Sequence, residues 1–234
     1  MEELQKIVTE IEARSEEATF EQEGIPIVEA SVSYPAVTYK GFQKNAAVLS
    51  RFYSCGAARY LKFVKKQMLP AARECYVQSV RMGTAPRLFE ARQTFQATYN
   101  AGLVSIYYDQ YEYTGGAHGG TARFSDTYYL PEGRFLRLRD LFRPRVPYRK
   151  LLLSEITRQI EQSLGRGGAF YYDNYRRGVK KHFSPAQFYL RPKGLSLYYQ
   201  QYTIAPYSMG LPTFFIPYER LENLLRFDLT LPEE

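Results

Sequence analysis

The chain has 234 residues, of which 45% are hydrophobic and 24% charged, enough to bury a core in one large domain or two small ones. Only two histidines and two cysteines are present, which excludes the usual clustered metal sites. No signal peptide is recognisable and no apolar run is long enough to cross a bilayer, so we expect either a soluble intracellular protein or a membrane anchor that lies outside this sequence.

The net charge of +7 is unevenly distributed. Residues 1–24 carry eight glutamates and two cations, a net charge of −6, so residues 25–234 carry +13. A body this basic attracts anionic partners such as nucleic acid, anionic wall polymers, acidic glycans or lipid headgroups. A solvated basic surface without a specific ligand is an equal alternative.

The N-terminal quarter of the chain is expected to change from helix to strand. The acidic segment 1–24 has apolar residues at helical spacing, which predicts a peripheral helix or a linker. The pattern then becomes extended from Ile25 to Tyr34 and predicts a first strand that ends at Pro35.

A long amphipathic helix follows, because apolar residues recur every three or four positions from Val48 to Val80. Gly56 and Pro70 are expected to kink or divide it. Cys55 and Cys75 both fall in or beside this pattern. In one continuous helix they would lie about 30 Å apart, too far for a disulfide, so free, buried thiols are expected.

The middle of the chain reads as an antiparallel meander. Segments 88–100 and 103–113 are β-rich and are joined by Asn100-Ala101-Gly102, which predicts a hairpin. Segments 121–130 and 134–138 predict a second hairpin around a turn that ends at Gly133.

The last third alternates between helices and strands. A helix is expected from Tyr148 to Leu164, with Gly165 as its stop signal, and a short helix at 172–181. The remaining predicted elements are strands at 183–191, 195–200 and 213–216, and a final helix that begins at Pro217.

Two strand-helix-strand halves in tandem therefore predict an α+β fold with antiparallel sheet. The predicted divisions are 1–24, 25–112 and 113–234.

The most unusual motif is YEYTGGAHG at 111–119, which places a histidine in a glycine run directly after an aromatic strand. The glycines allow positive φ angles and would expose main-chain N–H groups together with His118. Such a loop can form a binding edge. The alternative is a tight connection in which His118 hydrogen-bonds its own loop.

A second unusual segment, around Ala205-Pro206-Tyr207-Ser208, interrupts two strands. It predicts a firm turn that either offers Tyr207 to a ligand or protein partner, or packs it on the sheet.

Positive signals of catalysis or of cofactor binding are absent from the sequence. No metal-ligand spacing, no G-x-S-x-G elbow and no P-loop occurs. The expectation is therefore that the protein is not an enzyme and has no cofactor and no metal.

Three motifs together resemble a known family: YTGGAHG at 113–119, LRLRDLF at 136–142 after the Gly133 turn, and FYLRPKGLSLYYQQYTIAPYSMGLPTFFIPYERL at 188–221. The family is the domain of unknown function in the extracytoplasmic part of RsiV-type anti-sigma factors, which sense lysozyme. It also precedes the catalytic domain of some peptidoglycan deacetylases. The similarity covers about 113–225, and residues 27–100 look like the companion domain that precedes it.

The resemblance implies an α+β fold whose C-terminal part is similar to a subdomain of the actin/Hsp70 ATPase fold, without ATPase function. It implies a non-catalytic sensor or ligand-binding domain of a cell-envelope protein, outside the membrane, with lysozyme, peptidoglycan or an anionic wall polymer as partner. The residues carried over as candidate contacts are those of the two matching loops: Thr114, Gly115, Gly116, Ala117, His118, Gly119, Ala205, Pro206, Tyr207 and Ser208.

Lysozyme is itself basic, so its binding would need a local exception such as Arg123 meeting the acidic cleft of lysozyme. Two other functions compete with the binding domain. One is an accessory to a wall-modifying enzyme, or a wall hydrolase with a site at His118. The other is nucleic-acid binding through a basic helix face, placed last because no aromatic-basic recognition motif accompanies it. The residues of that face are Lys62, Lys65, Lys66 and Arg73.

Overall fold

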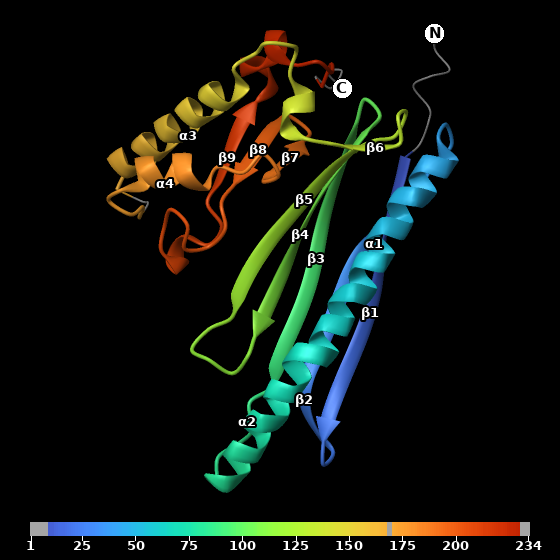
Figure 1. Cartoon of the computed structure of the whole chain (residues 1–234), viewed down its shortest axis with the longest axis vertical. Helices are drawn as coiled ribbons and strands as arrows, with labels where there is room; N and C mark the ends of the chain where they lie inside the picture. The colour runs from blue at the N-terminus through green and yellow to red at the C-terminus, as the bar shows by residue number, and fades with distance from the viewer. Residues whose placement is uncertain (1–8, 168–169, 230–234) are drawn as a thin grey trace. The chain divides into compact units, whose positions relative to one another are not determined.

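The computed structural model describes residues 9–167 and 170–229. Its strands form a six-stranded sheet in the order β1-β2-β3-β4-β5-β6 and a three-stranded sheet in the order β7-β8-β9 (Figure 1). The chain is therefore α+β, as predicted. It divides into two compact units, which we call unit 1 (Met1–Gln96 and Tyr108–Ala122) and unit 2 (Ala97–Tyr107 and Arg123–Glu234).

Unit 1 begins with a long hairpin. Strand β1 (Thr9–Gln22) pairs antiparallel with β2 (Ile25–Tyr39). The two residues between them, Glu23 and Gly24, both have positive φ angles, as a two-residue hairpin turn requires.

The predicted helix or linker at 1–24 is thus wrong from residue 9 onward, and the part before residue 9 lies outside the described residues. The helical spacing failed as a signal because β2 offers a backbone partner to every residue of β1. Ala18 and Phe20 of β1 pack against the core of unit 1.

Strand β2 also continues past Pro35, where the sequence predicted its end. Pro35 lies opposite Ala13 of β1. On its other side β2 pairs with β3 (Phe89–Asn100) only from Val28 to Val32. The proline therefore stands beyond that ladder, where its missing N–H breaks none of these bonds.

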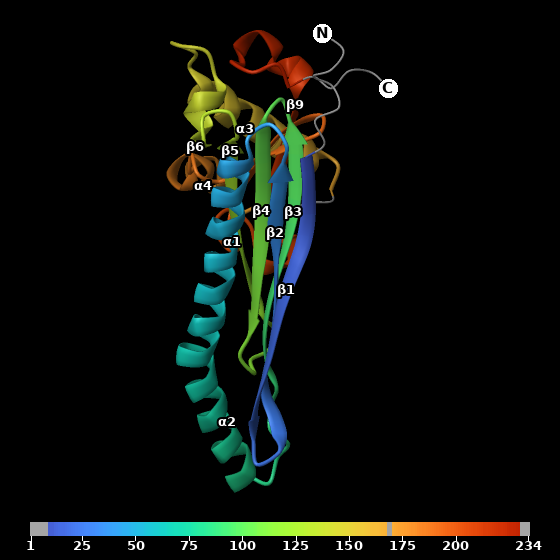
Figure 2. The ribbon, with the colours of Figure 1, turned by 90° about the vertical axis from the view of Figure 1, so that its right-hand side faces the viewer.

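The predicted long helix exists in three parts that run along β1 and β2 (Figure 2). These are α1 (Gln43–Phe63), a π-helical turn (Val64–Met68) and α2 (Leu69–Arg81). The break falls directly before Pro70, which occupies the first turn of α2, where a missing N–H is tolerated. Gly56, by contrast, lies inside α1 without interrupting it.

The residues that this helix buries differ partly from those predicted. Its buried face includes small residues such as Ala57 and Ala72, which allow close packing on β2, whereas Val48 and Val80 are exposed. Both cysteines are free, as expected, but Cys55 is exposed and Cys75 only half-buried. The expectation that both thiols are buried is therefore wrong.

The helical connection makes β2 and β3 parallel, which corrects the expectation of a purely antiparallel sheet. A helical crossover returns the chain in the same direction, so its two strands pair in parallel. Both predicted hairpins are confirmed: β3 with β4 (Leu103–Tyr113), and β5 (Gly120–Tyr129) with β6 (Arg134–Leu136). Their turns have positive φ at Ala101, Gly102 and Gly133.

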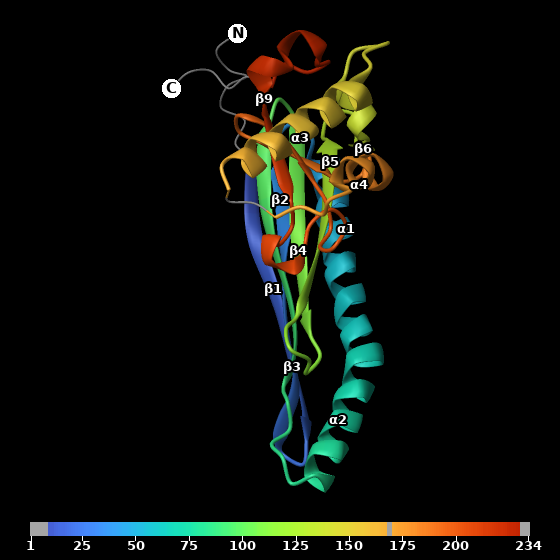
Figure 3. The same ribbon diagram turned by 90° about the vertical axis from the view of Figure 1, so that its left-hand side faces the viewer.

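In unit 2, helix α3 (Tyr148–Gly165) packs beside α4 (Tyr175–His182) and strand β9 (Figure 3). Strands β7 (Phe188–Arg191), β8 (Gly194–Tyr198) and β9 (Thr213–Pro217) form an antiparallel sheet. The core between α3 and this sheet includes Leu152, Ile156, Ile160, Leu195, Leu197, Phe214 and Ile216.

The helix predicted after Pro217 is wrong; two short 3-10 turns stand there, at Tyr218–Arg220 and Glu222–Leu224. The backbone that would continue a helix pairs elsewhere. The N–H of Arg143 donates to the carbonyl oxygen of Leu224 at 2.9 Å, and the N–H of Arg226 donates to that of Leu141 at 2.8 Å. Among the described residues, no helix combines the length and apolar character needed to span a membrane.

Candidate functional site

The glycine loop Thr114–Gly119 belongs to unit 1, although the sequence placed it with the C-terminal division that begins at residue 113. Two of its glycines are buried and serve packing. Gly115 has a φ angle of +80°, and a side chain there would meet Phe89 at 3.2 Å and Arg87 at 3.3 Å. The Arg87 guanidinium also donates a hydrogen bond to the Gly115 carbonyl oxygen.

His118 is exposed, and its Nδ1–H donates to the carbonyl oxygen of Gly119 at 2.9 Å. The ring of Tyr111 lies against Gly119 so closely that a methyl group there would collide with it. The loop therefore contains the hydrogen bond from His118 to its own backbone that the alternative interpretation predicted. Thr114, Gly116 and Ala117 are exposed beside it.

The second predicted loop, Ala205–Ser208, lies in unit 2. Ala205 is buried, and Tyr207 begins a 3-10 turn that ends at Met209. The Tyr207 ring stacks on that of Tyr202 with 5.9 Å between ring centroids. The two loops thus belong to different units, and their role as partner contacts stays a prediction.

Arg123, the cation expected to meet lysozyme, is held by tyrosines of unit 2. Its guanidinium carbon lies 4.2 Å from the ring centroid of Tyr107 and 5.6 Å from that of Tyr189. The backbone N–H of Arg123 also donates to the side-chain oxygen of Gln200 at 3.1 Å. These contacts assign Arg123 a packing role within unit 2.

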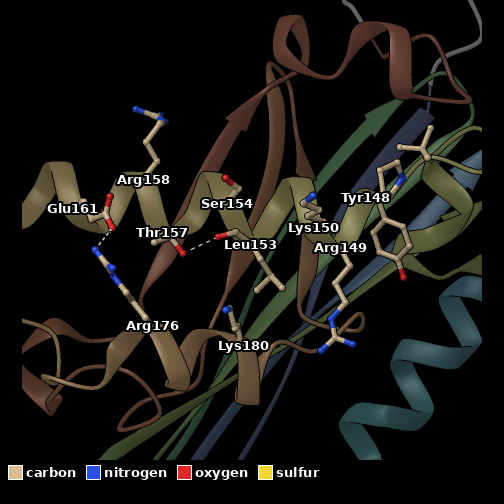
Figure 4. Close-up of a pocket in the computed structure, with 12 residues that line it drawn as sticks. Tyr148, Arg149, Lys150, Leu153, Ser154, Thr157, Arg158, Glu161, Arg176 and Lys180 are labelled. Carbon is tan, nitrogen blue, oxygen red and sulfur yellow. Dashed lines mark hydrogen bonds and ion pairs between the residues drawn. The ribbon is translucent and has the colours of Figure 1, made fainter.

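A site that the sequence did not reveal lies between α3 and α4 in unit 2. This hollow, which we call the α3–α4 groove, has a volume of about 830 Å³ (Figure 4). Its apolar lining comes from Val146, Tyr148 and Leu153. Its charged lining consists of one carboxylate, Glu161, and five cations: Arg149, Lys150, Arg158, Arg176 and Lys180.

The charges of the α3–α4 groove are only partly compensated. Arg176 reaches from α4 to Glu161 on α3, with 2.7 Å between nitrogen and oxygen (Figure 4). Arg158 pairs with Glu155 at 2.6 Å, and that hydrogen bond raises the pKa of its guanidinium. Within the described ranges, no carboxylate lies within 4.0 Å of the ammonium groups of Lys150 and Lys180.

The start of α3 adds to this positive character. Its first turn contains Arg149 and Lys150 but no acidic residue. Cations at a helix N-terminus oppose the helix dipole, so a bound anion would be stabilised by the cations and by the dipole together. The groove can therefore bind an anionic group through electrostatic attraction. Among the described residues, no cluster of three or more His, Cys, Asp or Glu side chains could bind a metal ion.

The sequence contained the components of the groove but not their arrangement. The stretches YRK at 148–150 and RRGVKKH at 176–182 are basic, and both were predicted to be at least partly helical. Their pairing across one groove depends on the packing of α3 against α4, which no local pattern encodes.

Comparison with known proteins gives two family matches. The sequence profile described as "Deacetylase PdaC" matches residues 3–121, about half of the chain. The profile described as "Protein of unknown function (DUF3298)" matches residues 139–219. The predicted relationship to a domain of unknown function and to its companion N-terminal domain is thereby confirmed. No curated protein matches the sequence significantly.

Two solved structures are similar along nearly the whole chain. The crystal structure of a DUF3298 family protein from Pseudomonas aeruginosa is 22% identical, with 97% of this chain and 98% of that chain covered and a TM-score of 0.57. That of a DUF3298 family member from Bacteroides fragilis is 18% identical, with 94% of each chain covered and a TM-score of 0.63. These similarities support the fold. The anti-sigma branch and the actin/Hsp70 likeness stay predictions.

Proposed function

Because the chain belongs to the family described as Deacetylase PdaC, we propose that it is a non-catalytic domain of a cell-envelope protein that binds an anionic wall polymer outside the membrane. The observation that carries this proposal is the excess of cations around the α3–α4 groove. The family name mentions a deacetylase, and in this proposal the chain is an accessory part that holds the wall substrate.

A wall polymer with repeating phosphate or carboxylate groups suits this groove. Lys150 and Lys180 come from different helices and are both available for charge-assisted hydrogen bonds, so adjacent anionic groups of one polymer can engage them together. Leu153 and Tyr148 offer apolar surface to the carbon backbone between those groups.

A basic protein such as lysozyme is a second candidate partner. The acidic residues that would attract it lie on unit 1. Strand β1 stands at the edge of the six-stranded sheet, where a strand has unpaired backbone groups. Several of its glutamates are exposed, among them Glu10, Glu12, Glu17 and Glu21. An acidic edge strand attracts cationic surfaces, which is the local exception that lysozyme binding by a basic protein requires.

The test is a calorimetric titration of the full chain with purified teichoic acid and, separately, with lysozyme. The double variant Lys150→Glu/Lys180→Glu should weaken teichoic acid binding by at least about tenfold. A matched control, Lys65→Glu/Lys66→Glu, changes the net charge equally at two exposed lysines of the π-helical turn in unit 1. It should retain most of the affinity.

If both double variants bind teichoic acid equally more weakly than the wild type, the polymer is attracted by net charge alone. That result would overturn the assignment of the groove. Absence of teichoic acid binding would overturn the polymer proposal. A complex with lysozyme that is lost on neutralising Glu10 and Glu17 would instead support the second candidate.

A further inference from the structure

A different hollow, of about 350 Å³, opens in unit 1 between α1 and the strands β3 and β4. We call it the α1–β4 cleft. Its lining consists of aromatic side chains, two amides, one carboxylate, one guanidinium and two small residues, among them Phe52, Tyr53, Phe63, Gln93, Gln110 and Glu112.

The aromatic residues present ring surface to the cleft. Phe52 and Phe63 are large apolar side chains that stay 37% and 39% exposed. Tyr53 meets Phe52 and Tyr108 edge-on, with ring centroids 5.2 and 6.2 Å apart. The exposed rings of Phe52 and Phe63 offer apolar surface to a flat ligand with C–H groups.

The two amides beside these rings are fixed in orientation. The side-chain amide of Gln93 donates to the carbonyl oxygen of Ser33 at 3.0 Å, and that of Gln110 donates to the side-chain oxygen of Gln93 at 2.8 Å. Within the part of the chain that the structure describes, the side-chain oxygen of Gln110 has no hydrogen-bond partner. It remains available to accept a hydrogen bond from a ligand.

The carboxylate of Glu112 is half-buried at the same cleft. Burial raises its pKa, and the neighbouring Tyr60 hydroxyl partly opposes that shift. That hydroxyl donates to the carbonyl oxygen of Tyr111 at 3.5 Å. The carboxylate oxygens of Glu112 can therefore accept hydrogen bonds from a ligand. Arg59 supplies the only cation of the lining, and the charges of Arg59 and Glu112 cancel.

Gly56 lines the cleft on the α1 side. It lies within the helix, yet a side chain there would meet only the Arg59 guanidinium, at 4.0 Å. Glycine inside a helix is unfavourable compared with alanine by about 1 kcal/mol. Glycine at position 56 therefore makes the helix less stable than alanine would. A larger side chain would fit there, but it would occupy the cleft.

We infer that the α1–β4 cleft binds a neutral pyranose saccharide. The sugar ring stacks on the aromatic faces, and its hydroxyl groups donate to the oxygens of Gln110 and Glu112. Aromatic surface with a few fixed polar groups is the usual chemistry of small-ligand sites, and a lining without net charge selects a neutral ligand. The volume is that of a site for a small ligand of mono- or disaccharide size.

The test is calorimetry and ligand-observed NMR of the full chain with a trisaccharide of N-acetylglucosamine and, in a second arm, a trisaccharide of glucose. At least one should bind. Gly56→Leu should weaken that binding by at least about tenfold, because leucine fills the cleft. Gly56→Ala leaves most of the volume open and should retain the binding.

The melting temperature separates loss of binding from loss of fold, since Gly56→Leu removes a helix-interior glycine and should not lower it. A second variant, Phe52→Ala, removes a partly exposed ring and should also weaken binding, whereas Phe170→Ala, an exposed ring of unit 2, should not. The inference is overturned if neither trisaccharide binds at millimolar concentration, or if Gly56→Leu binds as the wild type does. Lys150→Glu/Lys180→Glu should leave saccharide binding unchanged, so this inference and the proposed function fail independently.

Discussion

Replacing Glu155 by glutamine should destabilise unit 2 by an amount that depends on pH. Glu155 accepts two hydrogen bonds from the Arg158 guanidinium at 2.6 and 2.9 Å, a forked pair from Arg220 at 3.0 and 3.1 Å, and one from the Gln159 amide at 2.9 Å. Chiefly because of the hydrogen bonds from Arg158, the pKa of Glu155 falls from its ordinary 4.5 to about 2. Its side chain is only 17% exposed.

A shift of this size corresponds to about 3 kcal/mol at neutral pH. Arg158 and Arg220 are 41% and 54% exposed, so solvent screening reduces the expected loss to about 2 kcal/mol. A carboxylate whose pKa is lowered on folding stabilises the fold fully above its unfolded pKa. That stabilisation disappears as the pH falls from about 4.5 towards about 2.

The assay is thermal unfolding of wild type and Glu155→Gln at pH 7 and at steps down to pH 2, with Glu74→Gln as control. Glu74 is an exposed residue of α2 whose hydrogen bond from Gln78 is long, at 3.5 Å. The melting temperatures of wild type and Glu155→Gln should differ at pH 7 and converge near pH 2. A difference at pH 7 no larger than that of the control, or one that does not change with pH, would refute the reasoning.

Three further substitutions test packing by thermal unfolding. Gly56→Ala should raise stability by about 0.5–1 kcal/mol, because helix propensity improves and the new methyl group meets open space; a lower melting temperature would contradict this. Gly102→Ala should cost about 1–2 kcal/mol, because φ is +78° and the new methyl group would lie 3.1 Å from Pro131; an unchanged melting temperature would count against it. Arg123→Lys should cost about 1 kcal/mol, because an ammonium group cannot stack its plane on Tyr107; a neutral result would show that the stacking contributes nothing.

Signals from neighbouring residues predicted two hairpin turns and helix α3 well. Ala101-Gly102 and Gly133 mark hairpins in the sequence and have positive φ in the structure. Helix α3 agrees with its prediction because its apolar period and the glycines at its end are read from neighbouring residues alone.

Elements that depend on distant partners were predicted less well. Strand β1 has a helix-like spacing of apolar residues, yet it forms a strand because β2 lies beside it. The parallel pairing of β2 with β3 follows from the helical crossover between them, not from the residues of either strand.

The candidate sites show the same limit. The glycine run at 114–119 was noticed for its rarity, but Gly115 and Gly119 are explained by the packing of Arg87 and Tyr111. The α3–α4 groove and the α1–β4 cleft each combine residues from separate elements, so only the folded chain brings them together.

The central claim is that the α3–α4 groove holds an anionic polymer, and hydrogen–deuterium exchange of the full chain with and without purified teichoic acid tests it most directly. The polymer should slow exchange in peptides that cover the first half of α3, around Arg149 and Lys150, and in those that cover α4, around Lys180. Exchange that is unchanged in both helices, or slowed only in unit 1, would contradict the claim.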